Sequence, residues 1–157
     1  HNFLGVIHET NLLDPGRARH HFEAALAVNP HSAEAHHNLA NLLWRTFRRK
    51  EAIAHYLEAH DLDPRNSVFV YSLASAILQS DDSRGSLKRA KSLFLTAIKL
   101  SPQFADAYRG LGHALRDLGL HAEASRAYEQ IHQILGRQGE KQLMHLLQEV
   151  EAKLLQF

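Results

Sequence analysis

The stretch NLANLLWRTFRRKEAIAHYLEAHDLDP, residues 38–64, decides the fold. Its apolar residues recur at helical spacing, yet Ala40, Ala52 and Ala59 stand where a helix on an ordinary core could carry leucine. Small side chains let two antiparallel helices approach closely, and larger neighbours such as Tyr56 fill the gaps beside them. The stretch therefore predicts a pair of antiparallel helices.

The same arrangement returns along the chain. Pro30, Pro64 and Pro102 each close an apolar helical stretch, and they lie 34 and 38 residues apart. Each unit also has a small residue, then an aromatic residue four positions on, then alanine or isoleucine three further. These sets are Ala18–Phe22–Ala25, Ala52–Tyr56–Ala59, Ala90–Phe94–Ala97 and Ala124–Tyr128–Ile131. Earlier in each unit come the pairs Leu4–Gly5, Leu39–Ala40, Leu73–Ala74 and Leu111–Gly112, and we expect Gly112 to face Ala124.

A unit with this order of small, aromatic and proline residues resembles the tetratricopeptide repeat, a helix–turn–helix unit of 34 residues. The resemblance covers nearly the whole chain. It implies an all-α fold, a right-handed α-solenoid of antiparallel helix pairs, in which each pair needs the next one stacked on it to bury its apolar surface. We expect four tetratricopeptide-like repeats in residues 1–138, at about 1–32, 33–66, 67–104 and 105–138.

The third unit is longer than the second, and the segment SDDSRGSLKR at residues 80–89 locates the extra residues. Aspartate, serine and glycine favour loops, so we expect an enlarged loop between the two helices of this unit. Such a loop is either neutral or serves a partner. The neutral interpretation is favoured because surface loops tolerate added length at small entropic cost.

After Gly139 the repeat pattern stops. Leu143, Leu147, Val150 and Leu154 form one apolar stripe on an otherwise polar segment. A helix with a polar outer face lets a stack end without an open apolar surface. We therefore expect residues 139–157 to form a C-terminal capping helix that packs on the face containing Tyr128 and Ile131.

Composition excludes several classes of protein. The 157 residues include 18 Lys and Arg against 17 Asp and Glu, so the net charge of +1 supplies no general attraction to nucleic acid or to a membrane. No apolar run approaches the roughly 20 residues of a membrane span. The absence of cysteine fits a reducing compartment, and we expect a cytoplasmic protein. Because the first residue is His1 within a helical pattern, we interpret the chain as a piece of a longer polypeptide.

Chemistry-bearing motifs are missing from the sequence. Of the 13 histidines, no two lie four residues apart, the spacing that lets two side chains on a helix share a metal ion. Without cysteine to complete a ligand set, we expect no metal site and interpret the histidines as solvated helix-surface residues. No phosphate-binding loop or nucleophile motif is present either. We therefore expect no cofactor and no catalytic site in these residues, and predict that this chain is not an enzyme.

In stacked helix pairs the first helix of each unit lines the concave side, which is the natural place for a partner. Counting outward from the packed leucine and alanine positions gives the residues of that side. In the second unit they are Glu34, His37, Asn38, Asn41 and Arg45; in the third Val68, Tyr71, Ser72, Ser75 and Leu78; in the fourth Asp106, Arg109, His113 and Arg116. The mixture is polar at both ends and aromatic or aliphatic in the middle, and predicts a peptide-binding surface.

A second candidate surface is basic. Two clusters at successive inner turns would lie along the same edge of the stack and could meet phosphates or an acidic partner. We call them together the basic edge: Arg48, Arg49 and Lys50 in the first cluster, and Arg84, Lys88 and Arg89 in the second. No interleaved aromatic residues are expected there, which counts against single-stranded nucleic acid. The alternative is a solvated edge without a partner.

The leading hypothesis from the sequence is a non-catalytic scaffold that binds a protein or peptide partner, on its own or within a multi-subunit assembly. Two alternatives stay open. One is a basic-edged module that docks RNA or a ribonucleoprotein, although nucleic acid is the less favoured partner. The other is the substrate-recognition arm of a larger enzyme whose catalytic domain lies outside these residues.

Overall fold

The computed structural model describes residues 14–155, and every regular element in that range is a helix. The all-α fold predicted from the repeats is confirmed. The helices are α2 (Pro15–Val28), α3 (Ala33–Arg45), α4 (Arg49–Leu62), α5 (Ser67–Ser80), α6 (Arg84–Leu100), α7 (Ala105–Asp117) and α8 (His121–Leu154). The pair Leu4–Gly5 and the first helix expected in the first unit lie outside the described residues.

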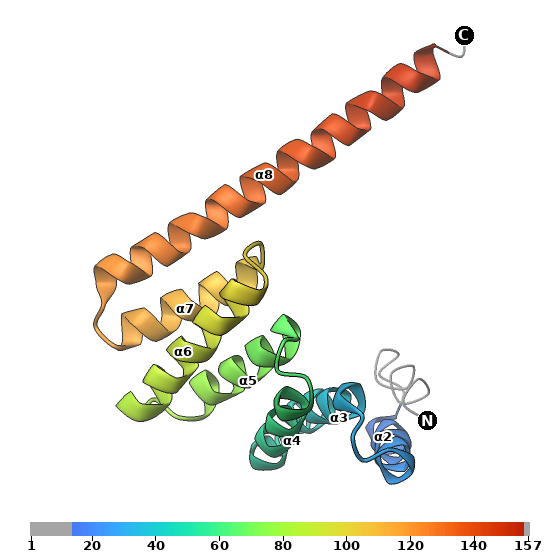
Figure 1. Ribbon diagram of the computed structural model, residues 1–157, viewed down its shortest axis with the longest axis vertical. Coiled ribbons are helices and arrows are strands. Elements are labelled where there is room, and N and C mark those ends of the chain that lie inside the picture. The colour runs from blue at the N-terminus through green and yellow to red at the C-terminus, as the bar shows by residue number, and fades with distance from the viewer. Residues whose placement is uncertain (1–13, 156–157) are drawn as a thin grey trace.

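The helices pack as a stack of pairs (Figure 1). Contacts are densest within the pairs α3–α4, α5–α6 and α7–α8. Each second helix then packs on the first helix of the next pair, as α2 does on α3, α4 on α5 and α6 on α7. Contacts therefore join neighbours in sequence, which is the arrangement of a solenoid.

The same turn separates successive pairs three times. Asn29, Asp63 and Ser101 follow the last residues of α2, α4 and α6, and each is followed by proline. The carbonyl oxygen of each accepts a hydrogen bond from the amide three residues on, at 3.1–3.2 Å. Because proline presets φ near −65° and has no N–H to lose, it favours this turn over further helix.

Alanines and aromatic rings share the core, as the sequence pattern requires. Ala40, Ala52 and Ala90 are fully buried, and so are the rings of Phe22 and Phe94. Full burial of large rings beside alanine shows how the stack fills its interior. The small residue admits the neighbouring helix, and the ring closes the space that remains.

Gly112 makes room for the ring of Tyr128 on α8. A Cβ atom at Gly112 would lie 2.4–2.8 Å from three ring carbons of Tyr128, its nearest neighbours. The sequence correctly indicated a close approach of α7 and α8 at this glycine, and the nearest neighbour of the missing side chain is the ring of Tyr128.

The extra residues of the third unit do not enlarge a loop. Only Asp81–Ser83 separate α5 from α6, and α6 begins at Arg84 with 17 residues, against 14 in α4. The hydroxyl of Ser83 accepts from the amide of Ser86 at 3.3 Å, and the carboxylate of Asp81 accepts from the hydroxyl groups of both serines at 2.7 Å. These bonds start the helix early and lower the pKa of Asp81, so the insertion becomes an added turn of α6.

The predicted capping helix is also wrong. Helix α8 runs unbroken from His121 to Leu154, so residues beyond Gly139 continue it and cannot turn back on Tyr128. Gly136 and Gly139 keep negative φ, and no proline follows them to stop the helix. The stripe expected to be covered is instead open: Leu143, Leu147, Val150 and Leu154 are 50–69% exposed.

Candidate functional site

The surface formed by α3, α5 and α7 contains two adjoining hollows. The first, about 180 Å³, is lined by Asn41, Trp44, Tyr56, Tyr71, Ser72, Ser75, Ala76 and Gln79. The second, about 330 Å³, is lined by Tyr71, Ser75, Leu78, Gln79, Phe94, Asp106, Arg109, Gly110 and His113. Because both share Tyr71, Ser75 and Gln79 of α5, they form one groove across the three helices, which we call the α3–α5–α7 groove.

Hydrogen bonds between helices fix the polar groups at one end of this groove. The hydroxyl of Tyr56 on α4 donates to Oδ1 of Asn41 on α3 at 2.7 Å, which leaves the amide nitrogen of Asn41 directed elsewhere. Nε2 of His37 on α3 lies 2.8 Å from Oγ of Ser72 on α5. The ring of His37 also packs on Phe69, with ring centroids 4.8 Å apart. Helices α3 and α5 are therefore tied together directly beside the first hollow.

Aromatic packing shapes the middle of the groove. The ring of Tyr71 lies between Phe104, at 4.8 Å between centroids, and Phe94, at 6.0 Å. Gly110 packs directly on the ring of Phe94, which is fully buried and lies behind the second hollow. The middle of the groove is therefore apolar and rigidly held.

Charged side chains lie at the α7 end of the groove. The guanidinium of Arg109 donates to Oδ1 of Asp106 at 2.8 Å, and Arg116 donates to Asp117 at 3.1 Å. Between them His113 packs edge-on to Tyr128, with ring centroids 5.9 Å apart. Burial and the adjacent Arg116 lower the pKa of His113. A ligand in this part of the groove would meet hydrogen-bonding groups whose charges are largely balanced.

Two more histidines form an internal contact behind α3. Nε2 of His36 lies 2.9 Å from the carbonyl oxygen of Pro30, which can only accept, so this nitrogen carries the proton. Nδ1 of His36 then accepts from Nδ1 of His55 on α4 at 3.0 Å. Burial, with the nearby His36, lowers the pKa of His55. The interpretation of the histidines as solvated surface residues is therefore wrong for His36, which is buried, and for the half-buried His37 and His55.

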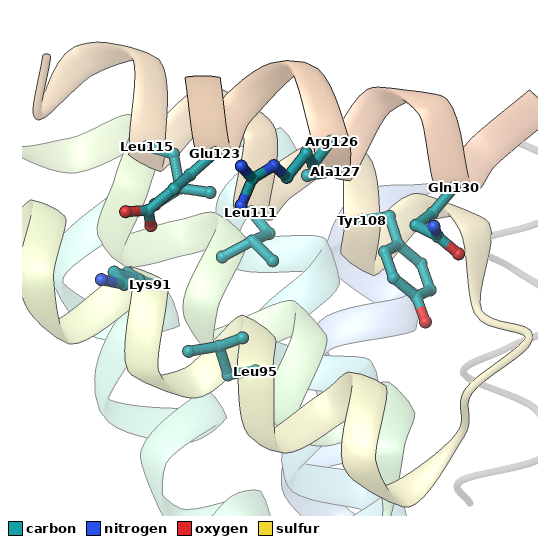
Figure 2. A pocket seen from close by; sticks show the side chains of 9 residues that line it. All are labelled: Lys91, Leu95, Tyr108, Leu111, Leu115, Glu123, Arg126, Ala127 and Gln130. Atoms are coloured by element: carbon teal, nitrogen blue, oxygen red, sulfur yellow. The ribbon is translucent and has the colours of Figure 1, made fainter. Parts of the chain in front are cut away.

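A third hollow lies on the side of the second helices, between α6 and α8 with α7 as its floor (Figure 2). Its volume is about 410 Å³, and Leu111 and Leu115 of α7 form its apolar base. Leu95 and Lys91 of α6 face Glu123, Arg126, Ala127 and Gln130 of α8 across it, with Tyr108 at one end. Its walls come from only two pairs, so it does not run along the stack as the α3–α5–α7 groove does.

Metal binding and membrane spanning find no support in the described part of the chain. Across residues 14–155 no three His, Asp or Glu side chains gather where they could hold a metal ion. Among the helices from α2 to α8, none is both long and apolar enough to cross a bilayer.

Comparison with known proteins agrees with the stack and its turns. The family model described as tetratricopeptide repeat matches residues 11–67 and 73–139, well over half of the chain. This chain belongs to the tetratricopeptide repeat family. The resemblance seen in the sequence and the right-handed α-solenoid that it implies are both confirmed.

Curated relatives share the repeats over short parts of their length. The chain is 36% identical over 78 residues to small glutamine-rich tetratricopeptide repeat-containing protein 2 of Mycosarcoma maydis, covering 50% of this chain and 21% of that protein. It is 29% identical over 125 residues to protein O-mannosyl-transferase TMTC3 of Homo sapiens, covering 71% and 13%. The chain thus spans about a fifth or less of these relatives.

Solved structures share the fold at low identity. The crystal structure of MamA is 22% identical, with a TM-score of 0.77 over 88% of this chain and 78% of MamA. MamA from Desulfovibrio magneticus RS-1 is 19% identical, with a TM-score of 0.76 over 87% and 75%. At this identity the likeness concerns the tetratricopeptide architecture alone.

Several residues predicted for the concave side of the tetratricopeptide stack do line its groove, namely Asn41, Tyr71, Ser72, Ser75, Leu78, Asp106, Arg109 and His113. The others lie outside the two hollows. His37 is half buried between helices, Asn38 is half buried on α3, and Glu34, Arg45 and Arg116 are exposed at helix ends. Sequence reasoning missed Trp44, Tyr56, Gln79 and Phe94. Gln79 and Trp44 continue the helical spacing of Ser75 and Asn41, and that signal could have found them.

The basic edge is exposed in both clusters, and the whole second cluster lies within α6, with Arg84 on the added turn and Lys88 and Arg89 just after it. In the first cluster Arg48 pairs with Glu51 at 2.7 Å, and the guanidinium of Arg49 lies 5.0 Å from the ring centroid of Trp44. Phe47, beside them, is 82% exposed. The expectation that no aromatic residue accompanies the basic edge is therefore wrong.

Proposed function

We propose that this chain is a non-catalytic scaffold that holds an extended peptide segment of a protein partner in the α3–α5–α7 groove. The observation that supports this most is the continuity of the two hollows across three successive first helices through Tyr71, Ser75 and Gln79. A partner spread over three pairs makes contacts that no single pair could supply.

The chemistry of the groove favours a peptide with an apolar residue flanked by polar groups. The middle offers the half-buried ring of Tyr71, with the buried ring of Phe94 behind it. The α3 end offers the amide of Asn41, which suits backbone carbonyls, and the α7 end offers Asp106 and Arg109. Binding sites for small segments are typically apolar with a few polar groups that fix orientation.

Blocking the groove at its centre is expected to weaken peptide binding at least about tenfold. Ser75→Arg places a long cation where the two hollows meet, whereas Ser92→Arg makes the same change on the exposed surface of α6. Peptides selected from a random displayed library on the parent protein would be measured by fluorescence polarisation. Equal loss with both variants, or no loss with Ser75→Arg, would show that the peptides bind elsewhere.

Docking of RNA or a ribonucleoprotein on the basic edge is the second candidate function. Trp44 and the exposed Phe47 lie near Arg49, and this observation favours RNA binding. Aromatic rings and guanidinium groups placed together can stack on bases. The balanced net charge favours the peptide scaffold over this alternative.

Reversing charge on the basic edge is expected to abolish any affinity for nucleic acid while leaving helix content intact. The variant carries Glu at Arg48, Arg49, Arg84 and Arg89, all exposed. Because each cation that meets a phosphate releases counterions, the parent's affinity should fall steeply with salt. Mobility-shift titrations with single-stranded and duplex RNA over a salt series provide the measurement, and equal binding by the variant would remove the basic edge from consideration.

A recognition arm of a larger enzyme is the third candidate. It is motivated by the match to a relative named as a transferase, of which this chain covers only 13%.

The absence of cysteine leads us to propose a reducing compartment, such as the cytoplasm, for any of the three functions.

A further inference from the structure

The last part of α8 extends beyond the stack with an apolar face that no other described element covers (Figure 1). We call residues 136–155 the α8 overhang. Ile134 is the last buried residue of α8, and every residue from Leu135 to Leu155 is exposed. Its large apolar residues are 50–88% exposed: Leu143, Met144, Leu146, Leu147, Val150, Leu154 and Leu155. An apolar group this dense on one exposed helix is typical of an interaction surface.

The spacing of these residues is that of a helix–helix seam. Leu143, Leu147, Val150 and Leu154 follow one another by four, three and four positions, as the core positions of paired helices do. At about 100° per residue, this stripe lies roughly 110° around α8 from Ala124, which is buried against the stack. The stripe is therefore a separate face of the helix, not an extension of the surface that packs on α7.

A further helix pair stacked on α8, as in a longer solenoid, would not bury this apolar stripe. In α4 and α6, Ile53 and Ile98 pack against the core beside the next pair. Measured from the buried alanine of each helix, these two positions hold Ile53 and His60 in α4 and Lys91 and Ile98 in α6, so each helix has one apolar residue there. In α8 they hold Ser125 and His132, and both are exposed. Along its first half, α8 is thus polar where a following pair would pack, and the apolar stripe begins only beyond it.

We propose that the α8 overhang pairs in antiparallel fashion with the α8 overhang of a second copy of this chain. Centred between Leu147 and Val150, this pairing sets Leu147 of each copy against Val150 of the other. It likewise sets Leu143 against Leu154. Met144 then lies near Glu151 of the second copy and Leu146 near Lys153, so no like charges meet at these flanks.

The shape of the molecule selects the antiparallel arrangement. Helix α7 packs along the first half of α8, and α2, α3 and α4 lie at the far end of the stack, well apart from α8 (Figure 1). A parallel pair would bring two stacks to the same end, whereas an antiparallel pair puts them at opposite ends and opposes the helix dipoles favourably. With about 50–100 Å² of apolar surface on each of six side chains, leaving out Leu155 on the far side of α8, two copies would bury about 600–1,200 Å² of it, and the upper end of this range reaches the size of a specific interface.

Molecular mass in solution is the first test, on the whole 157-residue chain. Light scattering after size-exclusion chromatography over a dilution series is expected to show a mass of twice 17.8 kDa at high concentration. Leu147→Glu with Val150→Glu is expected to weaken the dimer roughly 100-fold, because each change is felt twice in a symmetric contact. The matched control, Gln148→Glu with Ala152→Glu, adds the same charge on the other side of α8 and is expected to keep the dimer.

Orientation is tested by disulfide cross-linking, since the chain has no cysteine of its own. In the antiparallel pair Leu143→Cys lies beside position 154 of the second copy and about 16 Å along the axis from its own equivalent. Mixed Leu143→Cys and Leu154→Cys proteins are thus expected to cross-link to each other, and neither to itself.

A monomer at every concentration would overturn the proposal, as would a dimer indifferent to glutamate at Leu147 and Val150. Cross-linking of Leu143→Cys to itself would show a parallel pair and contradict the arrangement. Circular dichroism of each variant checks that its helices are intact. Because the substituted side chains are exposed, the stack should unfold as in the parent.

Discussion

Leucine in place of Gly110 is expected to lower the free energy of unfolding by about 3 kcal/mol. A Cβ atom here would lie 2.3–2.9 Å from three carbons of the Phe94 ring. That ring is fully buried and packs against Tyr71, so it has no free space into which to move. The clash between the new side chain and the Phe94 ring can be relieved only if α7 shifts away from α6, and this shift exposes apolar surface along the stack. Urea unfolding followed by circular dichroism measures the loss.

Alanine substitutions at two helical glycines provide the control. Gly110→Ala is expected to destabilise the protein, whereas Gly136→Ala is expected to stabilise it by about 0.5–1 kcal/mol, because nothing lies within 4 Å of a Cβ there and alanine is the better helix former. Gly112→Leu should cost about 1–3 kcal/mol, since the half-exposed Tyr128 ring can partly yield. A Gly110→Ala protein as stable as the parent would refute the packing assigned to Phe94.

A double variant separates the clash from other effects of the substitution. Phe94→Leu with Gly110→Ala is expected to be more stable than the sum of the two single changes predicts, because the smaller side chain leaves room for the new methyl group. Strict additivity would mean that Gly110 matters through its backbone rather than through the ring of Phe94.

The repeat could be predicted from the sequence because its signals are local. Proline, the capping residue before it and the alternation of small and large residues act within a few positions, and they predicted the turns at Pro30, Pro64 and Pro102. The two errors in helix boundaries come from competition between local signals. Ser83 is a loop former that instead capped α6, and Gly139 is a helix breaker that lacks the following residues to end α8.

The groove was harder to predict than the stack. Asn41, Tyr71 and Ser75 were found by counting along first helices, and that count is reliable because helical spacing is fixed. Tyr56 and Phe94 line the groove from second helices, and Phe94 does so where Gly110 of α7 leaves room for its ring. The contribution of these two rings to the groove depends on how neighbouring helices pack together. The spacing of residues within a single helix does not predict such packing. The same limit hid the burial of His36, which depends on Pro30 and on α4.

Acidification from pH 7 to pH 5 is expected to lower the free energy of unfolding of the stack. Burial lowers the pKa of His37, His55 and His113 below the ordinary value of 6.5. Below that value the unfolded chain binds protons that the folded chain does not, so stability is complete above pH 6.5 and declines as the pH falls toward the folded pKa values. Each group adds at most about 1.4 kcal/mol per pH unit, and solvent screening reduces the share of the more exposed His55 and His113.

His37 should account for the largest part of this pH dependence, because it is held between α3 and α5 against Ser72 and Phe69. His37→Gln keeps a hydrogen-bonding group near Ser72 but cannot titrate, so its unfolding free energy should fall less between pH 7 and pH 5 than that of the parent. Ser72→Ala is the matched control: it removes the hydrogen bond, lowers stability at pH 8 by about 1 kcal/mol, and leaves the imidazole to titrate. Urea unfolding at half-unit pH intervals gives the slopes. A parent slope of zero below pH 6.5, or an unchanged slope in His37→Gln, would show that protonation of this histidine does not oppose folding.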